Sequence, residues 1–381
     1  TNIKSVAQSL SPKALQNGPP TDRQTDRQTD RPRIGWLDTA RAFAIVAVLL
    51  VHATENLYIM DPAHLNVMSW YSKLFAITGF TVGRLGVPLF LFLTGYLLLD
   101  RVYDVGKIQR FWKRNWLGIL VTTEIWIVLY DVFLRLFHFQ HWSTKELIRD
   151  MLFMDQVHMG HMWYMLMIIG VYLCIPFVAR ALRNIDLKTI IFPLLILSFY
   201  AFGIPIIKSW GNAFSHFGDI RSLLDLGFSG GIYGIYIVLG LCVKRGLLHK
   251  LGTGILFAGM IVSLLLTIGL QWFSYGHGVA YNVWYDNGLL LLCTLCLFGL
   301  FSRISATRIH GICLWLSLNS FGIYLVHFPF IMLLRKVLIP LSVPMPGKVI
   351  LLWVSVLIIS CVICKIINLS PRLGRLLLYS R

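Results

Sequence analysis

The chain has 381 residues, of which 57% are hydrophobic and only 13% are charged, whereas soluble globular domains carry about 25% charged residues. Apolar segments of about 20 residues, enough to cross a hydrocarbon core of about 30 Å, recur along the chain and predict an all-α polytopic membrane protein. The net charge of +17 does not indicate nucleic-acid binding, because the basic residues lie in short clusters between apolar segments.

The first 34 residues are polar and contain the repeat TDRQTDRQTDR (residues 21–31). We expect a disordered cytoplasmic tail over residues 1–34, without a cleavable signal peptide, so that the first span remains as a signal anchor. The Thr-Asp-Arg-Gln period is also what a tandem ACAG tetranucleotide encodes. Such tracts change length by slippage, so the repeat predicts phase variation of the gene; an inert linker is the alternative reading at the protein level.

The rest of the chain predicts about ten membrane-spanning helices in one domain, residues 35–370, followed by a basic cytoplasmic tail, residues 371–381. Lys and Arg are more numerous in the connections after the even-numbered spans, which places both termini in the cytoplasm. The spans are expected at 36–54, 80–99, 115–136, 162–182, 188–207, 227–243, 251–272, 284–302, 312–334 and 348–367.

Two ionisable residues lie in the first span, in the sequence RAFAIVAVLLVH (41–52). Arg41 and His52 are three helical turns apart, so they share one face at a separation of roughly 16 Å along the axis. Asp38 shares much of that face and is placed to pair with Arg41. Ionisable groups at membrane depth point to function, and this pair suits a long substrate with an anionic part and a reactive end. Snorkelling of both side chains to the interfaces is the alternative.

Polar residues on other spans are expected to reach the same cavity. Arg84 lies at the expected outer start of the span 80–99, beside a Gly/Pro interruption of the kind that opens a cavity in a helix, and Glu124 lies on the third span. An aromatic belt, or a histidine satisfied within the bundle, is the alternative for the remaining members. These are His158, His161, Trp163 and Tyr164 at the start of the span 162–182, and Ser320, Tyr324 and His327 on the span 312–334.

Seven cysteines all fall within predicted spans, and four of them form two CxxC pairs. Neither pair has a second ligand pair in a neighbouring loop, so no metal site is predicted. A thiol in an apolar helix usually behaves as a small buried apolar group.

Four short motifs follow one another along the spans. They are the pattern Arg-x10-His at residues 41–52 preceded by LD, then GVPLFLFLTGY, HMWYM and SFGIYLVH. Together they resemble the motifs of the membrane-bound acyltransferase 3 family, in which the last three read GVPLFFxxSGY, HLWF/Y and SYxxYLxH. The resemblance covers residues 34 to about 370. Thr94 stands where the family often has serine and keeps the hydroxyl group.

The resemblance implies transfer of an acyl group, usually acetyl from cytoplasmic acetyl-CoA, to a hydroxyl of a glycan or another envelope molecule. Arg41 and His52 match the family's essential pair, Arg84 its arginine before GVPLF, and His327 its last-motif histidine. We expect Arg41 to engage CoA, His52 to deprotonate the acceptor hydroxyl and Arg84 to stabilise the oxyanion. A covalent acyl-His52 intermediate is an open alternative to direct transfer.

These implications predict an enzyme of the bacterial inner membrane with no tightly bound cofactor. Its partners are acetyl-CoA, membrane lipid and a glycan or lipid-linked glycan; short loops and the repeat favour a surface polysaccharide such as the O-antigen of lipopolysaccharide. A secondary transporter or flippase of a lipid-linked sugar is the rival function, since it also needs buried charges along a pathway. No two-fold repeat of span lengths or motifs is visible, which counts against that rival.

Overall fold

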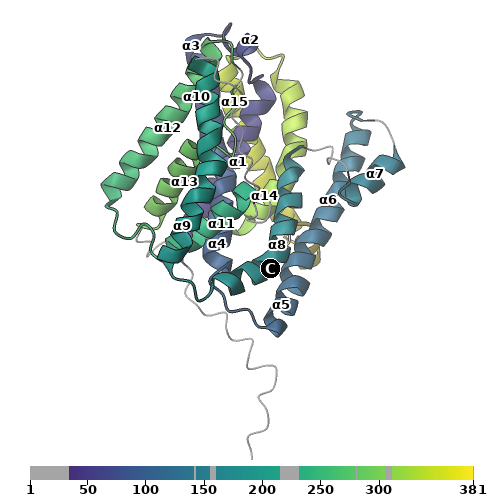
Figure 1. Ribbon diagram of the computed structural model, residues 1–381. Helices are drawn as coiled ribbons and strands as arrows, with labels where there is room; N and C mark the ends of the chain where they lie inside the picture. Colours follow the sequence, from purple (N-terminus) through teal and green to yellow (C-terminus); the bar gives the residue numbers. More distant parts are fainter. Residues whose placement is uncertain are drawn as a thin grey trace, which may run out of the picture. The chain divides into compact units, whose positions relative to one another are not determined.

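The computed structural model describes residues 34–140, 143–154, 160–214, 231–279, 281–304 and 311–380, which are helices and connections without a strand. The TDRQ repeat and His158 lie outside these residues. The helices, shown in Figure 1, are α1 (Gly35–Leu57), α2 (Pro62–Leu65), α3 (Trp70–Arg84), α4 (Gly86–Leu98), α5 (Val105–Phe111), η2 (Trp112–Trp116), α6 (Leu117–Leu136), α7 (Thr144–Met151), η3 (Gly160–Met162), α8 (Trp163–Leu182), α9 (Leu187–Ser198), η4 (Phe199–Gly203), α10 (Ile204–Phe214), α11 (Gly231–Lys244), α12 (Thr253–Gly276), α13 (Gly288–Phe301), α14 (Gly311–Leu338), α15 (Met345–Ile367) and α16 (Pro371–Leu377).

Long apolar helices dominate the described part of the chain, as the sequence predicts for an all-α membrane protein. Eight of them are long and apolar enough to cross a membrane, and α11 and α13 are shorter apolar helices. Each of the ten predicted spans overlaps one of these helices. The number that cross the bilayer and the side on which the termini lie remain predictions. The eight spans are Gly35–Leu57, Trp70–Leu98, Val105–Leu136, Gly160–Leu182, Leu187–Ser209, Thr253–Gly276, Gly311–Leu338 and Met345–Ile367.

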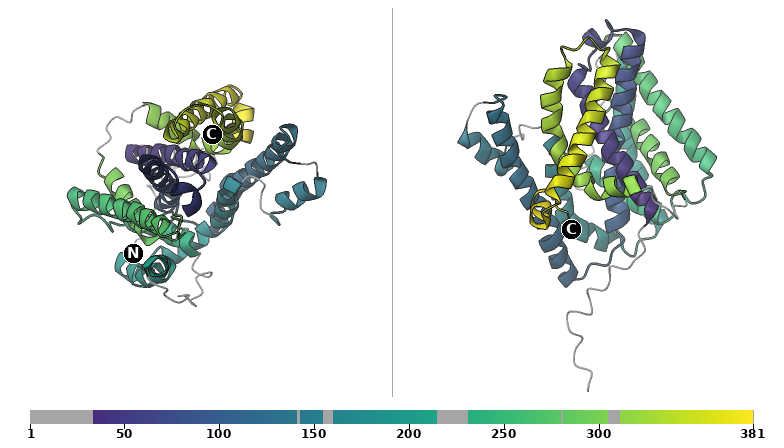
Figure 2. Two further views of the ribbon diagram at one scale, coloured as in Figure 1. Left: turned by 90° about the horizontal axis from the view of Figure 1, so that it is seen from above. Right: turned by 180° about the vertical axis from the view of Figure 1, so that it is seen from behind.

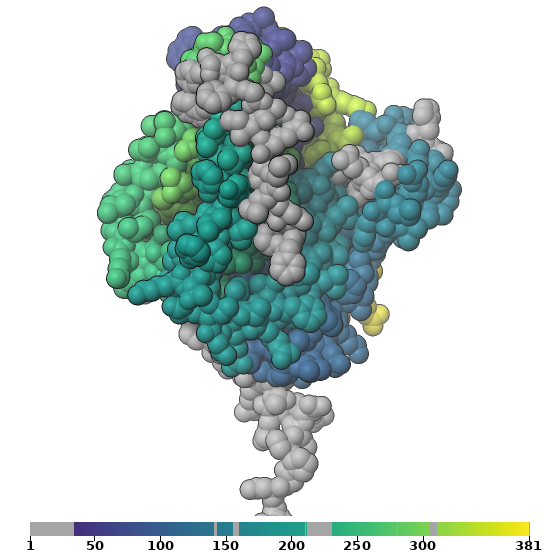
Figure 3. All heavy atoms as spheres, in the orientation of Figure 1, coloured from purple at the N-terminus to yellow at the C-terminus, as the bar shows by residue number. Residues whose placement is uncertain are grey.

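Apolar side chains cover the outward surfaces of these helices. Phe192 on α9 is 71% exposed and Leu265 on α12 is 60% exposed, and both helices contribute to the face seen in Figure 3. Apolar surface on this scale is unfavourable in water but is normal against lipid tails, where helices satisfy their own backbone groups. The chain is therefore an integral membrane protein.

Helix α1 lies at the centre of the bundle and packs against α3, α4, α13, α14 and α15. Figure 2, viewed from above, shows it between the yellow helices of the C-terminal part and the remaining helices. Its small residues Ala40, Ala44 and Ala47 are almost fully buried, and small residues let neighbouring membrane helices approach closely. Residues on every side of α1 therefore contact other helices, and this includes the polar residues of α1.

Helices α3 and α4 form one span, and this corrects the predicted depth of Arg84. Only Leu85 separates the two helices, and together they make a span of 29 residues, Trp70–Leu98. Arg84 is therefore near the middle of the span and not at its outer start. The predicted span, 80–99, leaves out the first turns of α3, which contain Lys73. Lys73 is buried, donates a hydrogen bond to the Asn66 amide oxygen (2.7 Å) and lies over the Trp272 ring.

Two glycines bring this span close to α1. A Cβ at Gly83 would lie 2.6 Å from the Val51 Cβ, and one at Gly86 would lie 2.7 Å from a Val48 methyl group. Any side chain at these positions would force the helices apart. The glycines thus permit close helix packing instead of opening a cavity, and they set Arg84 beside the stretch of α1 that carries His52.

The predicted basic tail contains a folded helix, α16, which packs against α6 and α15. Pro371 is at its first position and the Ser370 hydroxyl caps it by accepting a hydrogen bond from the Leu373 amide. Both features favour the start of a helix. Figure 1 shows the C-terminal end at the same end of the bundle as α5.

Candidate active site

Three histidines from distant parts of the sequence meet inside the bundle. His52 of α1, His161 of η3 and His327 of α14 have ring centroids 5.2 to 6.1 Å apart. His161 and His327 are almost fully buried, and His52 is 8% exposed. We call these three residues the histidine cluster. It contains three of the predicted site residues.

His52 is held by a carboxylate from its own helix. Its Nδ1–H donates to the Glu55 carboxylate at 2.5 Å, and the other carboxylate oxygen accepts a hydrogen bond from Arg84 Nη2 at 3.2 Å. Because Nδ1 faces a carboxylate, we assign the proton of the neutral imidazole to Nδ1. Nε2 then carries the lone pair and is the basic atom of His52.

Arg84 is enclosed by aromatic rings. Its guanidinium lies 4.3 Å from the Trp284 ring centroid and 4.6 Å from that of Phe80, and it donates to the Tyr285 hydroxyl at 3.2 Å. Arg84 Nε is buried and has no hydrogen-bond partner among the described residues. The arginine therefore fixes Glu55 and keeps one N–H available.

Hydrogen bonds fix the tautomers of the other two histidines. The Tyr130 hydroxyl donates to the Leu325 carbonyl, so it accepts from His161 Nε2–H at 3.1 Å. His327 Nδ1–H donates to the Tyr324 carbonyl at 2.5 Å. The remaining ring nitrogens, His161 Nδ1 and His327 Nε2, are buried acceptors without a partner among the described residues. Such atoms normally find a partner, so they indicate a place for a ligand donor.

One face of α14 supplies most of the polar residues that meet α1. Ser317, Ser320, Tyr324 and His327 follow the spacing of a single helical face, and all four are buried. At one end Ser317 donates to the Asp38 carboxylate at 2.5 Å, and at the other end the His327 ring lies against His52. The polar face of α14 therefore meets polar residues of α1 at both ends, Asp38 at one and His52 at the other.

Arg41 and Asp38 form the pair that the sequence predicts. Arg41 Nη1 lies 3.6 Å from the Asp38 carboxylate and donates to the Ser317 hydroxyl at 3.1 Å. The Asp38 side chain is 3% exposed, whereas the Arg41 side chain is 26% exposed. Arg41 thus retains access to the space beside it.

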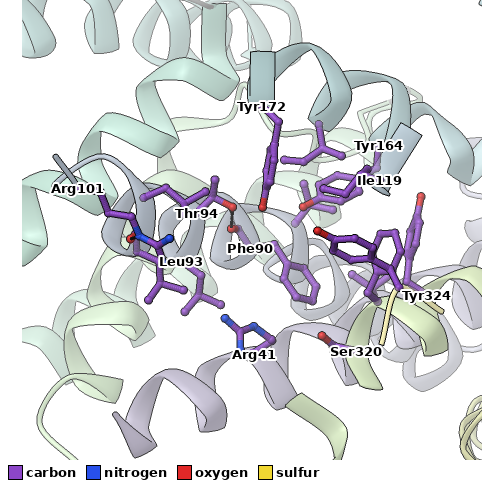
Figure 4. A pocket seen from close by; sticks show the side chains of 17 residues that line it. Arg41, Phe90, Leu93, Thr94, Arg101, Ile119, Tyr164, Tyr172, Ser320 and Tyr324 are labelled. Atoms are coloured by element: carbon purple, nitrogen blue, oxygen red, sulfur yellow. Dashed lines mark hydrogen bonds between the residues drawn. The ribbon is translucent and has the colours of Figure 1, made fainter. Parts of the chain in front are cut away.

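That space is a cavity of about 270 Å³, which we call the Arg41 cavity. Figure 4 shows Arg41 and Arg101 toward one side of it and Tyr164, Tyr172 and Tyr324 toward the other. Most of its walls are apolar, and a few polar groups point inward, as is typical of a small-molecule site. The lining residues are Arg41, Val48, Val87, Phe90, Leu93, Thr94, Leu97, Leu98, Arg101, Ile119, Tyr164, Ile168, Tyr172, Ser320, Phe321, Tyr324 and Tyr379.

Tyr324 separates the Arg41 cavity from the histidine cluster. Its ring lines the cavity and also lies 5.5 Å from His161 and 5.8 Å from His327, and its hydroxyl donates to the His161 carbonyl at 2.5 Å. Val48 lines the cavity one helical turn before His52 on α1. The two sites are therefore neighbours, with a single tyrosine layer between them.

A family model described as an acyltransferase domain matches residues 34–369 of the chain. The chain belongs to the acyltransferase 3 family. No curated protein and no solved structure matches it. The family makes this integral membrane protein an acyltransferase, and the histidine cluster with the Arg41 cavity is its candidate active site.

Two other predicted site residues of this acyltransferase have different surroundings. Trp163 belongs to an aromatic layer with Tyr233, Trp284 and Tyr285, at centroid distances of 5.5 to 6.1 Å, and so lies next to Arg84. Glu124 on α6 does not line the Arg41 cavity, and its Oε2 has no partner among the described residues. The structure brings Trp163 toward the cluster and does not bring Glu124 there.

The sequence did not indicate several residues of the candidate site. Glu55 bridges His52 and Arg84, and its signal was an acidic residue three positions after the histidine. Tyr130 and Tyr285 gave no such signal, because each meets its partner only through helix packing.

Among the described residues no group of three or more His, Cys, Asp or Glu side chains is arranged to hold a metal ion. All seven cysteines are free thiols.

Proposed function

We propose that the protein is an O-acetyltransferase that moves an acetyl group from cytoplasmic acetyl-CoA to a hydroxyl of a bacterial surface polysaccharide or a lipid-linked glycan. The observation that carries the proposal is the His52–Glu55 pair at 2.5 Å, set one helical turn beyond the Arg41 cavity. A buried histidine oriented by a carboxylate is the arrangement that activates hydroxyl nucleophiles in acyl transfer. The membrane is then the bacterial inner membrane, where donor and acceptor meet.

The Arg41 cavity suits the donor. Its apolar walls and volume of about 270 Å³ fit a chain such as an acyl-pantetheine arm. Arg41 and Arg101 provide guanidinium groups, which bind phosphate through paired N–H donors. The donor is a substrate, and the proposal includes no tightly bound cofactor.

His52 performs the proton transfers of the reaction. Nε2 takes the proton of the acceptor hydroxyl as its oxygen forms the new bond to the thioester carbonyl carbon. The C–S bond then breaks, and the imidazolium returns the proton to the leaving thiolate, giving an ester and free CoA. Glu55 holds the imidazole in the required tautomer and stabilises its positive charge.

The other buried polar groups have complementary roles. The free Nε–H of Arg84 is a donor for the carbonyl oxygen as it becomes negative. His161 Nδ1 and His327 Nε2 are acceptors for hydroxyl groups. A polyhydroxylated acceptor offers several such donors, whereas a simple alcohol offers one.

The acceptor side carries the aromatic layer of Trp163, Tyr233, Trp284 and Tyr285. Trp284 is 42% exposed and lies beside the Arg84–Glu55–His52 chain. Aromatic faces stack on the apolar faces of pyranose rings, so this layer supports a glycan as acceptor. The lipid-exposed helices around it admit a glycan carried on a membrane lipid, such as a precursor of O-antigen or of another lipopolysaccharide glycan.

Transport of a lipid-linked sugar is the weaker function. The acyltransferase family covers nearly the whole described helical region, and the His52–Glu55 pair with its free Nε2 has a use in catalysis but none in simple passage. Phase variation of the gene is a separate proposal that rests on the TDRQ repeat; identical codons across the repeat are expected, and mixed synonymous codons would exclude it.

The test uses the purified full-length protein in lipid nanodiscs with acetyl-CoA labelled in the acetyl group. We expect release of free CoA that depends on added envelope polysaccharide, with label recovered on the glycan as an ester. Release that does not require an acceptor, or glycan movement across vesicles without acetylation, would contradict the proposal.

A further inference from the structure

The segment of residues 371–380, which we call the α16 segment, is tied to the bundle by its backbone. Trp126 Nε1 donates to the Leu377 carbonyl at 2.6 Å, and the Thr122 hydroxyl donates to the Leu376 carbonyl at 3.2 Å. The last carbonyls of a helix have no partner within the helix. Side chains of α6 therefore satisfy the end of α16, and the segment is a fixed part of the fold.

The chain turns sharply at the end of this segment. Tyr379 has φ = +51°, a left-handed conformation that is unfavourable for a bulky residue without glycine's freedom. Leu378, just before it, is 4% exposed and packs on Gly322 of α14. Such strain persists only where the surroundings enforce it, and it is often found at functional sites.

The turn carries the Tyr379 ring to the Arg41 cavity, of which it forms a wall. Its ring lies 6.0 Å from the Phe321 ring, in an edge-on arrangement, and its hydroxyl donates to the Arg114 carbonyl at 2.9 Å. That carbonyl belongs to the π-helical turn η2, and π-helical turns are frequent at functional sites. A Cβ on Gly118 would overlap the Tyr379 ring, so α6 leaves room for it.

We propose that the α16 segment is part of the donor-binding site and that Tyr379 holds the pantetheine arm of the acyl-CoA against Phe321 in the Arg41 cavity. This inference rests on the proposed acetyl-CoA donor. Tyr379 provides a ring face for the methylene groups of the arm, and Arg101 lies at the same cavity for the phosphates. The segment after the last long helix thereby determines donor affinity.

The experiment measures binding of acetyl-CoA to the full-length protein in nanodiscs. Tyr379→Ala raises the Kd by about tenfold, because the ring contact with the arm is lost, and Tyr379→Phe changes it by less than about threefold, because the ring remains. Leu376→Ala is the matched control, since Leu376 belongs to the same α16 segment, is 47% exposed and does not line the cavity. It leaves the Kd unchanged.

A second variant displaces the ring without removing it. Gly118→Ala places a methyl group where the Tyr379 ring lies, so it weakens acetyl-CoA binding as Tyr379→Ala does. In the double variant the methyl group meets no ring, and the Kd equals that of Tyr379→Ala alone, a non-additive result expected of groups in contact. Additive effects would overturn the inference. If Tyr379→Ala unfolds, Gly118→Ala alone tests the inference, and an unchanged Kd for acetyl-CoA in that variant would overturn it.

A truncated donor locates the contact on the arm. S-acetylpantetheine lacks the nucleotide, so its binding weakens in Tyr379→Ala by the same factor as that of acetyl-CoA. An effect on acetyl-CoA alone would overturn the placement on the arm. If the wild-type protein binds neither probe, the proposed donor is wrong; if it binds both and Tyr379→Ala binds them equally well, only this inference is wrong.

Discussion

The histidine cluster and the Arg41 cavity both contain residues of α1 and α14, but their environments differ. At the cluster, a chain of hydrogen bonds joins the buried His52 to the half-buried Glu55 and then to the buried Arg84. In the cavity, arginine and tyrosine side chains project from apolar walls into about 270 Å³ of space. The side chains of the first region are held in place by hydrogen bonds, although His161 Nδ1, His327 Nε2 and Arg84 Nε keep no partner among the described residues. The second region is open.

The contrast separates chemistry from binding. Buried groups with fixed partners need no rearrangement when charge develops, so a closed cluster favours the transition state. An open apolar cavity with a few charged groups favours a flexible substrate. Variants of the cluster should therefore lower kcat, whereas variants of the cavity should raise the KM for the donor.

Replacing His52 breaks the cluster most severely. His52→Ala removes the proposed base, and we expect kcat to fall by about 10³-fold, while size-exclusion chromatography shows intact folded protein. His64→Ala is the matched control, because His64 of α2 is exposed and pairs with Asp61, the residue that caps the same short helix. Wild-type acetylation by His52→Ala would contradict the assignment.

Glu55 tests whether the orientation of His52 matters as well as its presence. Glu55→Gln removes the charge that holds Nδ1–H and Arg84, so kcat is expected to fall by about 10²-fold with little change in the KM for acetyl-CoA. Steady-state kinetics in both substrates check this. Asp61→Asn, outside the site, should leave kcat unchanged. A rise in the KM for acetyl-CoA without a fall in kcat would assign Glu55 to donor binding and not to the orientation of His52.

The close approach of α3 and α4 to α1 underlies both regions. Gly86→Ala places a methyl group against Val48 and the Ala44 carbonyl, and we expect the free energy of unfolding to fall by about 1–3 kcal/mol. Gly170→Ala on α8 is the control, because a Cβ there meets nothing within 4 Å. Denaturant titration in detergent measures both. Equal stability of the two variants would contradict the packing argument.

A conservative change in the cavity should affect binding alone. Arg41→Lys keeps the positive charge beside Asp38 but loses the planar pair of donors, so the KM for acetyl-CoA is expected to rise about tenfold with kcat within about threefold. Arg335→Lys, at the exposed end of α14, should change neither. A large fall in kcat for Arg41→Lys would show that Arg41 acts in the chemical step and not only in donor binding.

The smallest effect is expected on the acceptor side. Trp284→Phe reduces the exposed ring beside Arg84, and the KM for the glycan is expected to rise by about two- to fivefold, with the KM for acetyl-CoA unchanged. Trp70→Phe is the control, since Trp70 is 69% exposed on α3 and has no contact with Arg84. Equal effects of the two variants on the KM for the glycan would show that Trp284 acts only as a membrane-interface residue.

Local patterns explain what was predictable in the fold. Apolar runs identify membrane helices because each run satisfies its own backbone and meets lipid. The predicted span 80–99 left out the first turns of α3, where Lys73 is buried by contacts with Asn66 and Trp272, two residues outside the helix. The α16 helix was missed because its stability depends on Thr122 and Trp126, about 250 residues earlier in the chain.

The sequence by itself determined the membrane class, the family motifs and the common face of Asp38, Arg41 and His52, because helical periodicity is a local property. Only the tertiary structure decided which residues from different helices meet. His161 and His327 come to His52, Glu55 receives Arg84, and Tyr379 reaches the Arg41 cavity. Those meetings depend on how closely the helices pack, and glycines such as Gly83 and Gly86 set that distance. Interhelical contacts therefore turned separate motifs into a candidate active site.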